Sequence, residues 1–289
     1  MRRTVEEMFR KMYGDLPFDG GQADDFLRSA NLNQCEETSM LTSDITVKEI
    51  NNAIGQLNKS SSPGLDGLPA EFYQELYQEL SDELSPILAR AFNEGIKRGY
   101  FYVSFYRGVI TLLYKKGDEK NINNWRHLTL ANTDYKIYAK VMMHRLNDCL
   151  DDIIEKEQTC AVKDRFMWDN LCTLREALYH KEGKGCFIVA LDQKKAFDLV
   201  SREYLWETMK HFGIPPVLID MIKYMYVQTV CQVNINGHLT EKIDIKRGVK
   251  QGCPLSAALY IIAISPLLRK IVRVSLLQDV YSHPRRRLL

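Results

Sequence analysis

Hydrophobic residues recur at helical spacing along much of the chain. Thr46 and Glu49 have the spacing of a capping box, and apolar residues from Val47 to Leu57 then fall on one face. This pattern predicts a helix that begins after Thr46. Similar patterns predict a helix or helix pair from Pro69 to Gly99 with a break near Pro86, and helices at 135–150, 202–212, 216–226 and 254–272.

Short apolar runs predict strands between these helices. Gly108 to Lys115 is typical of a strand, and Phe187 to Leu191 predicts a short buried strand that ends at Asp192. Val230 to Ile235 and Leu239 to Ile245 flank Asn236-Gly237, a dipeptide that suits a two-residue type I′ turn. Helices interleaved with strands and a hairpin favour an α+β (mixed α/β) fold.

The first 43 residues differ from this pattern, because they have no sustained period and contain Gly20-Gly21. We interpret residues 1–43 as an irregular lead-in or linker. Residues 44–271 then form the main folded region, and residues 272–289 form a basic tail.

Composition is that of a globular protein. The 289 residues are 45% hydrophobic and 26% charged, which excludes collagen-like and wholly disordered classes. Seven cysteines without a C-x-x-C pair argue against a disulfide framework or a zinc site. The N-terminus is charged where a signal peptide is apolar, and the longest apolar run is too short to cross a bilayer. We expect a protein that is intracellular, cytoplasmic or nuclear, and not bound to a membrane.

Charge is unevenly distributed along the chain. The net charge is +2, but residues 245–289 carry nine basic residues and one acidic residue, a local excess of +8. Such an excess is compatible with a polyanionic partner.

Asp192 is the first candidate for chemistry. A carboxylate at the end of a buried strand has a fixed backbone, which suits it to hold a hard cation. The alternative is a helix N-cap or a partner in a salt bridge.

Two further segments are candidates for binding an anion. Arg247 to Pro254 holds two glycines that allow close backbone approach to a ligand, although an ordinary loop before a helix has the same composition. Tyr114 to Asp118, followed by Trp125-Arg126, forms a basic turn beside an aromatic residue. Such a turn suits phosphate, and the alternative is a solvated turn.

Five motifs in series resemble the reverse transcriptase of non-LTR (LINE-type) retrotransposons over roughly residues 40 to 271. They are Ser62-Pro63-Gly64-Leu65-Asp66-Gly67, I-T-L-L-Y-K-K-G-D, N-W-R-H-L-T-L, L-D-Q-K-K-A-F-D and R-G-V-K-Q-G-C-P-L-S. The resemblance implies the fingers and part of the palm of a right-hand polymerase. It implies an RNA-directed DNA polymerase that takes an RNA template, a DNA primer and deoxynucleotides.

The resemblance also implies roles for single residues. Asp192 matches a catalytic carboxylate that binds metal in a two-Mg²⁺ site. Phe197 matches the bulky residue that excludes a ribose 2′-hydroxyl. Asp198 matches the A-F-D ending, which in the family is not a metal ligand, and we interpret it as structural.

Other residues would contact the nucleotide by the same resemblance. Arg126 would pair with the incoming triphosphate, assisted by Lys115 or Lys116. Gln251 and Gly252 match a loop that lies along the nucleotide and template.

Two departures from the family pattern change the expectation. His127 stands where the family has proline, and the lost restriction on φ is expected to loosen a loop there. The sequence also reaches Leu289 without the Tyr-x-Asp-Asp hairpin that supplies the second pair of carboxylates. We therefore expect this chain to be truncated before that motif and inactive by itself. The alternative is a non-enzymatic remnant that binds RNA or DNA, with Arg285, Arg286 and Arg287 as contacts, or a retroelement fragment without function.

Overall fold

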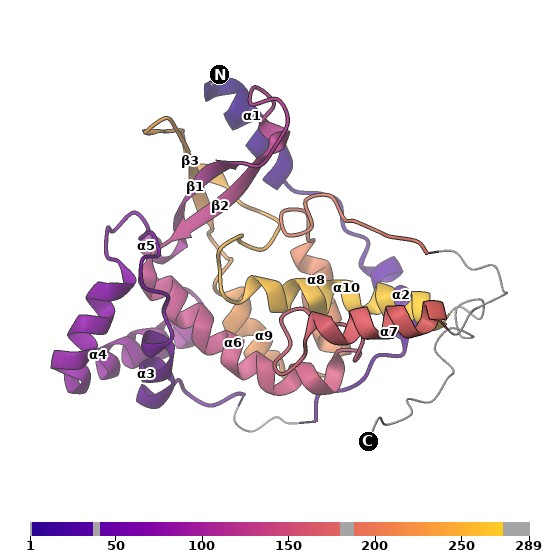
Figure 1. Ribbon diagram of the computed structural model, residues 1–289. Coiled ribbons are helices and arrows are strands. Elements are labelled where there is room, and N and C mark those ends of the chain that lie inside the picture. The colour runs from indigo at the N-terminus through magenta and orange to yellow at the C-terminus, as the bar shows by residue number, and fades with distance from the viewer. Residues whose placement is uncertain (1, 37–40, 180–187, 274–289) are drawn as a thin grey trace.

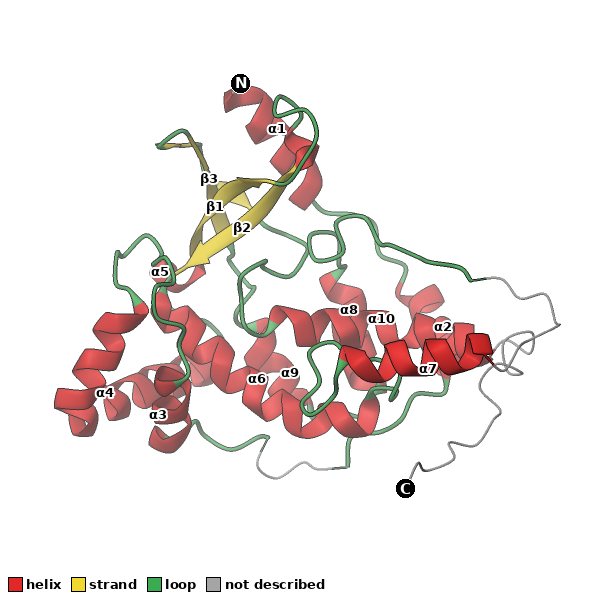
Figure 2. Cartoon of the chain, viewed as in Figure 1, coloured by secondary structure: helices red, strands yellow, loops and turns green. Residues whose placement is uncertain are grey.

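The computed structural model describes residues 2–36, 41–179 and 188–273. The mixture of helices and strands confirms the α+β class (Figure 1, Figure 2). The helices are α1 (Arg2–Tyr13), α2 (Gly20–Ala30), α3 (Val47–Gly55), α4 (Ala70–Arg98), α5 (Val103–Tyr106), α6 (Thr133–Ile153), α7 (Met167–Tyr179), α8 (Arg202–His211), α9 (Pro216–Lys223) and α10 (Ser256–Arg273), with a 3-10 turn at Ile122–Asn124. The strands are β1 (Arg107–Tyr114), β2 (Trp125–Ala131), β3 (Val230–Ile235), β4 (His238–Leu239) and β5 (Ile243–Asp244).

The strands form one small sheet that stands above a larger helical body (Figure 2). The order is β2-β1-β3-β4, and β5 also pairs with β3. β1 and β2 are antiparallel, whereas β1 and β3 are parallel and lie more than one hundred residues apart in sequence. Asn236 and Gly237 have φ angles of 50° and 84°, which confirms the predicted turn. The strand predicted over 239–245 is instead two short strands, β4 and β5.

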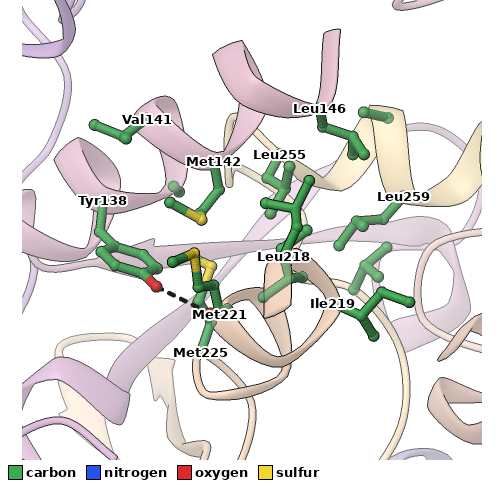
Figure 3. Packing of buried hydrophobic residues seen from close by; sticks show 14 of the residues in the cluster. Tyr138, Val141, Met142, Leu146, Leu218, Ile219, Met221, Met225, Leu255 and Leu259 are labelled. Atoms are coloured by element: carbon green, nitrogen blue, oxygen red, sulfur yellow. Dashed lines mark hydrogen bonds between the residues drawn. The ribbon is translucent and has the colours of Figure 1, made fainter. Parts of the chain in front are cut away.

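The main hydrophobic core surrounds α6, which has apolar residues on several faces. Side chains of α6 pack against α9 and the start of α10 (Figure 3). In this core the hydroxyl of Tyr138 donates to the backbone oxygen of Met221 at 3.0 Å. A second, smaller core lies between α1 and the sheet, where Phe9 is fully buried.

Residues 1–43 are therefore not an irregular lead-in over the part that the structure describes. α1 covers the sheet through Val5, Phe9 and Met12, which follow one helical face. α2 is attached to α10, since Lys270 donates to Ser29 Oγ at 2.6 Å. The difference arises because the segment folds as two short amphipathic helices, each too short to show a sustained hydrophobic period.

The long predicted helix α4 deviates at a different place from the one expected. Leu80 has non-helical φ and ψ of −131° and 37°, whereas Pro86 lies inside regular helix. Gly99, in the left-handed region, ends the helix as predicted. The capping box of Thr46 and Glu49 is also present.

The strand predicted over 187–191 is wrong for the residues that the structure describes. Phe187 lies outside them, and residues 188–192 have no assigned secondary structure. Ile188, Val189 and Leu191 are 64%, 75% and 80% exposed. An apolar run becomes a strand only where another strand pairs with it. None of the described strands pairs with this run.

Among the helices of the three described ranges, none has the length and apolar character needed to span a bilayer.

Candidate functional site

Three segments that are distant in sequence meet below the sheet. The loop from Ile245 to Gly252 lies between β2 and the turn at 193–200. Thr129 donates its backbone N–H to the oxygen of Gln251 at 2.8 Å, and Val249 donates to the oxygen of Phe197 at 2.9 Å. The motifs that contain Phe197 and Gln251 are therefore joined through backbone hydrogen bonds.

Two glycines make this close approach possible. Gly248 has a φ of +81°, and a Cβ there would lie 2.6 Å from the backbone oxygen of Asp198. Gly252 has a φ of +98°, and a Cβ there would lie 3.1 Å from Leu128 Cδ1 and from the oxygen of Thr129. Both positions combine a left-handed backbone with little free space, which explains glycine in this loop.

The carboxylate of Asp198 lies at the centre of the junction and is 3% exposed. Tyr13 donates its hydroxyl to Oδ1 at 2.7 Å, and Gln251 donates Nε2 to Oδ2 at 2.9 Å. Burial raises the pKa of Asp198, and these donors together with Lys195 oppose that shift.

His127 lies beside this carboxylate as a neutral ring. Its Nδ1 is 3.9 Å from Asp198 Oδ2, too far for a hydrogen bond, and its ring packs edge-on against Phe9. Burial, and then the charge of Lys195, lower the pKa of His127 to about 4. The residue belongs to β2 and pairs with Leu112. His127 thus lies in a paired strand and not in a loop, and the effect of the missing proline stays a prediction.

Lys250 attaches the same loop to α6. Its ammonium lies 3.8 Å from the centroid of the Tyr135 ring and is buried without a hydrogen-bond partner in the described structure. Burial lowers the pKa of Lys250 to about 8. The contact with the ring replaces part of the hydration that this cation loses.

Asp192 is exposed and lies in an extended segment, not at the end of a buried strand. Its charge is close enough to add to burial in raising the pKa of Tyr260. Tyr260 also donates to Gln193 Oε1 at 2.7 Å and stacks on Phe197, with the ring centroids 5.2 Å apart. The structure thus brings Asp192, Phe197 and Tyr260 into one neighbourhood.

The basic candidates lie on the β1–β2 hairpin. Arg126 is exposed on β2, opposite Leu113, and both Lys115 and Lys116 are exposed in the turn. Tyr114 and Trp125 pack edge to face at the base of this turn. Arg285, Arg286 and Arg287 lie outside the described residues.

The donor set does not complete a site for divalent cations. Mg²⁺ takes oxygen ligands in octahedral geometry, and a two-metal site needs several carboxylates. Over residues 2–36, 41–179 and 188–273, no group of three or more His, Cys, Asp or Glu side chains could hold an ion. Asp192 therefore belongs to no such group among the described residues.

Comparison of the sequence with known proteins identifies the family of this chain. The family described as "Reverse transcriptase (RNA-dependent DNA polymerase)" matches residues 114–280, more than half of the chain. The chain belongs to the reverse transcriptase family. The match includes β2, the turn that holds Phe197 and the loop that holds Gln251.

Relatives place this reverse transcriptase domain among non-LTR retrotransposon proteins. It is 39% identical over 230 residues (79% of this chain, 17% of the relative) to "Transposon TX1 uncharacterized 149 kDa protein" of Xenopus laevis. It is 26% identical over 211 residues (73% and 28%) to the "Retrovirus-related Pol polyprotein from type-1 retrotransposable element R2" of Popillia japonica. It is 27% identical over 239 residues (80% and 25%) to the "RNA-directed DNA polymerase from mobile element jockey" of Drosophila melanogaster.

These matches span 17% to 28% of the length of the three relatives. The reverse transcriptase domain is therefore similar to one part of much longer proteins.

Two residues of the junction were not anticipated. Tyr260 lies in a predicted helix, but nothing in the sequence indicated that it would stack on Phe197. Tyr13 lies about 185 residues before Asp198, so no local sequence pattern predicts the hydrogen bond between them. The apolar spacing of Val5, Phe9 and Met12 was the available signal for its helix.

Proposed function

We propose that this chain forms the fingers and part of the palm of an RNA-directed DNA polymerase of a non-LTR retrotransposon. The observation that carries the proposal is the junction of the motifs. Residues around 126–129, 192–198 and 248–252 lie far apart in sequence but converge through direct backbone hydrogen bonds. Convergence of this kind is expected if the three segments serve one ligand.

The triphosphate of an incoming deoxynucleotide is assigned to the basic hairpin. The exposed guanidinium of Arg126 suits bidentate pairing with phosphate oxygens, and Lys115 and Lys116 add point charges. Gln251 and the exposed backbone at Gly252 would lie along the nucleotide and the template.

Phe197 is assigned to the exclusion of ribonucleotides. Its ring is held in place by stacking on Tyr260, and its backbone oxygen is bonded to Val249. A fixed ring under the sugar would clash with a 2′-hydroxyl and leave deoxyribose unaffected.

Asp192 is assigned as one ligand of a divalent cation, Mg²⁺, which neutralises phosphate charge when bound. A single exposed carboxylate cannot supply the ligands that two ions require. The 289 residues contain one acidic residue after Asp244, namely Asp279, and no Tyr-x-Asp-Asp sequence. We therefore propose that these residues alone do not extend a primer.

Primer extension on an RNA template tests this proposal. We expect no extension by the 289-residue chain with Mg²⁺ or Mn²⁺, and no further change in Asp192→Ala. A graft of a family Tyr-x-Asp-Asp hairpin with the remaining palm after residue 271 should restore extension, and Asp192→Ala in that graft should abolish it. Extension by the 289-residue chain that is lost in Asp192→Ala would contradict the inactivity. A folded graft that never extends a primer would contradict the polymerase assignment.

Nucleic-acid binding without catalysis is a second candidate, because cations gather at the exposed hairpin turn. RNA affinity measured against salt concentration tests it, since each lost phosphate contact reduces the slope. Alanine at Lys115, Lys116 and Arg126 together, or deletion of residues 272–289 with Arg285, Arg286 and Arg287, should flatten the slope. An unchanged slope in both variants would exclude these contacts.

A further inference from the structure

Asp198 joins the N-terminal helix to the loop that holds Gln251. One oxygen of the carboxylate accepts from Tyr13 on α1, and the other accepts from the side chain of Gln251. Tyr13 and Asp198 are both buried, so water does not readily replace the bond between them. α1 lies outside residues 114–280, which the family comparison matches.

α1 is also fixed to the loop by its main chain. Lys246 donates its backbone N–H to the oxygen of Tyr13 at 3.0 Å, and its ammonium contacts Asp15 at 2.7 Å. The guanidinium of Arg247 donates to the oxygen of Met12. Movement of α1 would therefore disturb both Asp198 and the loop.

The backbone of Gln251 is held separately, because its oxygen accepts from Thr129 at 2.8 Å. The orientation of the side-chain amide is then set by Asp198. Both oxygens of Asp198 act as acceptors, one for the Tyr13 hydroxyl and one for Nε2 of Gln251, so the carboxylate faces the NH₂ group and not the amide oxygen. Oε1 of Gln251 is thereby left as the group that can meet a ligand.

We propose that Tyr13 and Asp198 are positioning residues that fix the side-chain amide of Gln251 with its oxygen available as a hydrogen-bond acceptor. The amide then favours ligand groups with an O–H or N–H, and α1 becomes part of the site. The identity of the ligand as a nucleotide or template rests on the proposed function, but the positioning does not.

Exchange of side-chain amide protons with water tests the positioning in the full 289-residue chain. With ¹⁵N-labelled glutamine, the Gln251 signal is assigned by its loss in Gln251→Ala. We expect its exchange to be about tenfold slower than that of the exposed Gln228, as one hydrogen bond of ordinary strength implies. If the side-chain amides of Gln251 and Gln228 exchange at equal rates in the unmodified chain, the proposal is overturned and no further variant is needed.

Tyr13→Phe removes one hydroxyl and keeps the ring. Loss of this donor should loosen Asp198 and bring the Gln251 exchange rate close to that of Gln228. Tyr138→Phe is the matched control, because it removes a buried hydroxyl that donates to Met221 in the other core. A general loss of stability would raise the exchange rate of the Gln251 amide equally in both variants. That result would overturn the role of Tyr13, and so would an unchanged rate in Tyr13→Phe.

Binding of a deoxynucleoside triphosphate with Mg²⁺ gives an independent readout. Tyr13→Phe should weaken binding several-fold, up to about tenfold, whereas Tyr138→Phe should leave it unchanged. Binding that is equally tight in the unmodified chain and in Tyr13→Phe would overturn the link between α1 and the ligand. If the unmodified chain binds no nucleotide, the proposed function fails and amide exchange still decides the positioning.

Discussion

At the scale of single residues, neighbours from distant segments determine the chemistry of the junction. Asp198 is buried among two hydrogen-bond donors, while Asp192, six residues earlier, is exposed. His127 is equally buried but has no hydrogen-bonded partner at Nε2 in the described structure. Burial raises the pKa of Asp198 and lowers the pKa of His127, because burial disfavours the charged form of either group.

His127 predicts an acid-sensitive stability. Burial lowers its pKa from 6.5 to about 4. Between these values the unfolded chain binds a proton that the folded chain does not. The free energy of unfolding is therefore unaffected by this histidine above pH 6.5. It falls by about 3 kcal/mol as the pH drops to 4.

Denaturant unfolding from pH 4 to 7.5 checks this expectation. The raised pKa of Asp198 acts with the opposite sign, since it favours the folded state as pH falls. The difference between the unmodified chain and His127→Phe isolates the histidine. His238→Gln is the control substitution, because it replaces an exposed histidine. A His127→Phe curve parallel to that of the unmodified chain would contradict the prediction.

Phe197 predicts a change in sugar selectivity in the grafted enzyme described above. Removal of the ring in Phe197→Ala should reduce discrimination against ribonucleotides by about tenfold or more. The measurement is the ratio of kcat/KM for deoxynucleotides and ribonucleotides. Tyr260→Phe retains the stacked ring and removes only the bond to Gln193, so it should leave the ratio unchanged. Unchanged selectivity in Phe197→Ala would exclude the assigned role.

At the scale of elements, the loop from Ile245 to Gly252 links parts of the fold that are distant in sequence. It contacts α1, β2 and the turn at 193–200. Arg202 supports it from α8 by donating to the backbone oxygens of Ile245 and Gly248 at 2.8 and 3.0 Å. The loop is thus hydrogen-bonded to α1, α8, β2 and the turn at 193–200. Gly248 and Gly252 allow these close approaches, because a Cβ at either position would crowd its neighbours.

Gly248→Ala should destabilise the fold by more than about 2 kcal/mol, because a Cβ adds a close contact to a strained left-handed backbone. Gly237→Ala is the matched control. Its φ of +84° is similar to the +81° of Gly248, but a Cβ there would meet nothing within 4 Å. The control should therefore show only the backbone cost of about 1 kcal/mol. Chemical denaturation measures both, and equal losses would show that the approach to Asp198 is unimportant.

At the scale of the whole molecule, several of the described segments expose large apolar side chains, and two of these segments are the start of α7 and residues 188–191. Phe166, Met167 and Trp168 are 66% to 72% exposed at the start of α7, and Ile188, Val189 and Leu191 are exposed in the extended segment. α7 has no buried residue. Exposed apolar groups of this extent favour association.

We expect the 289-residue chain to be marginally stable and to self-associate as concentration rises. Trp168→Lys combined with Val189→Lys should shift the molar mass from light scattering toward that of the monomer. Tyr102→Lys is the control, because this tyrosine is 73% exposed next to α5. A monomer at all concentrations with a sharp, reversible melt above about 60 °C would contradict the expectation.

The sequence alone determined the features that depend on neighbouring residues. The capping box of Thr46 and Glu49, the turn at Asn236-Gly237 and the helical period of α6 rest on interactions within a few positions. The order of the motifs also identified the family, since that order is a property of the chain and needs no coordinates.

Tertiary structure alone decided the features that need a distant partner. β1 pairs in parallel with β3, whereas the apolar run from Ile188 to Leu191 stays outside the described sheet, although both runs have strand composition. A strand is stabilised by hydrogen bonds to another strand, so its own residues do not suffice to form it. The bonds of Tyr13 and Gln251 to Asp198 arise in the same way. They exist because folding removes water from one carboxylate and brings two donors to it from opposite ends of the chain.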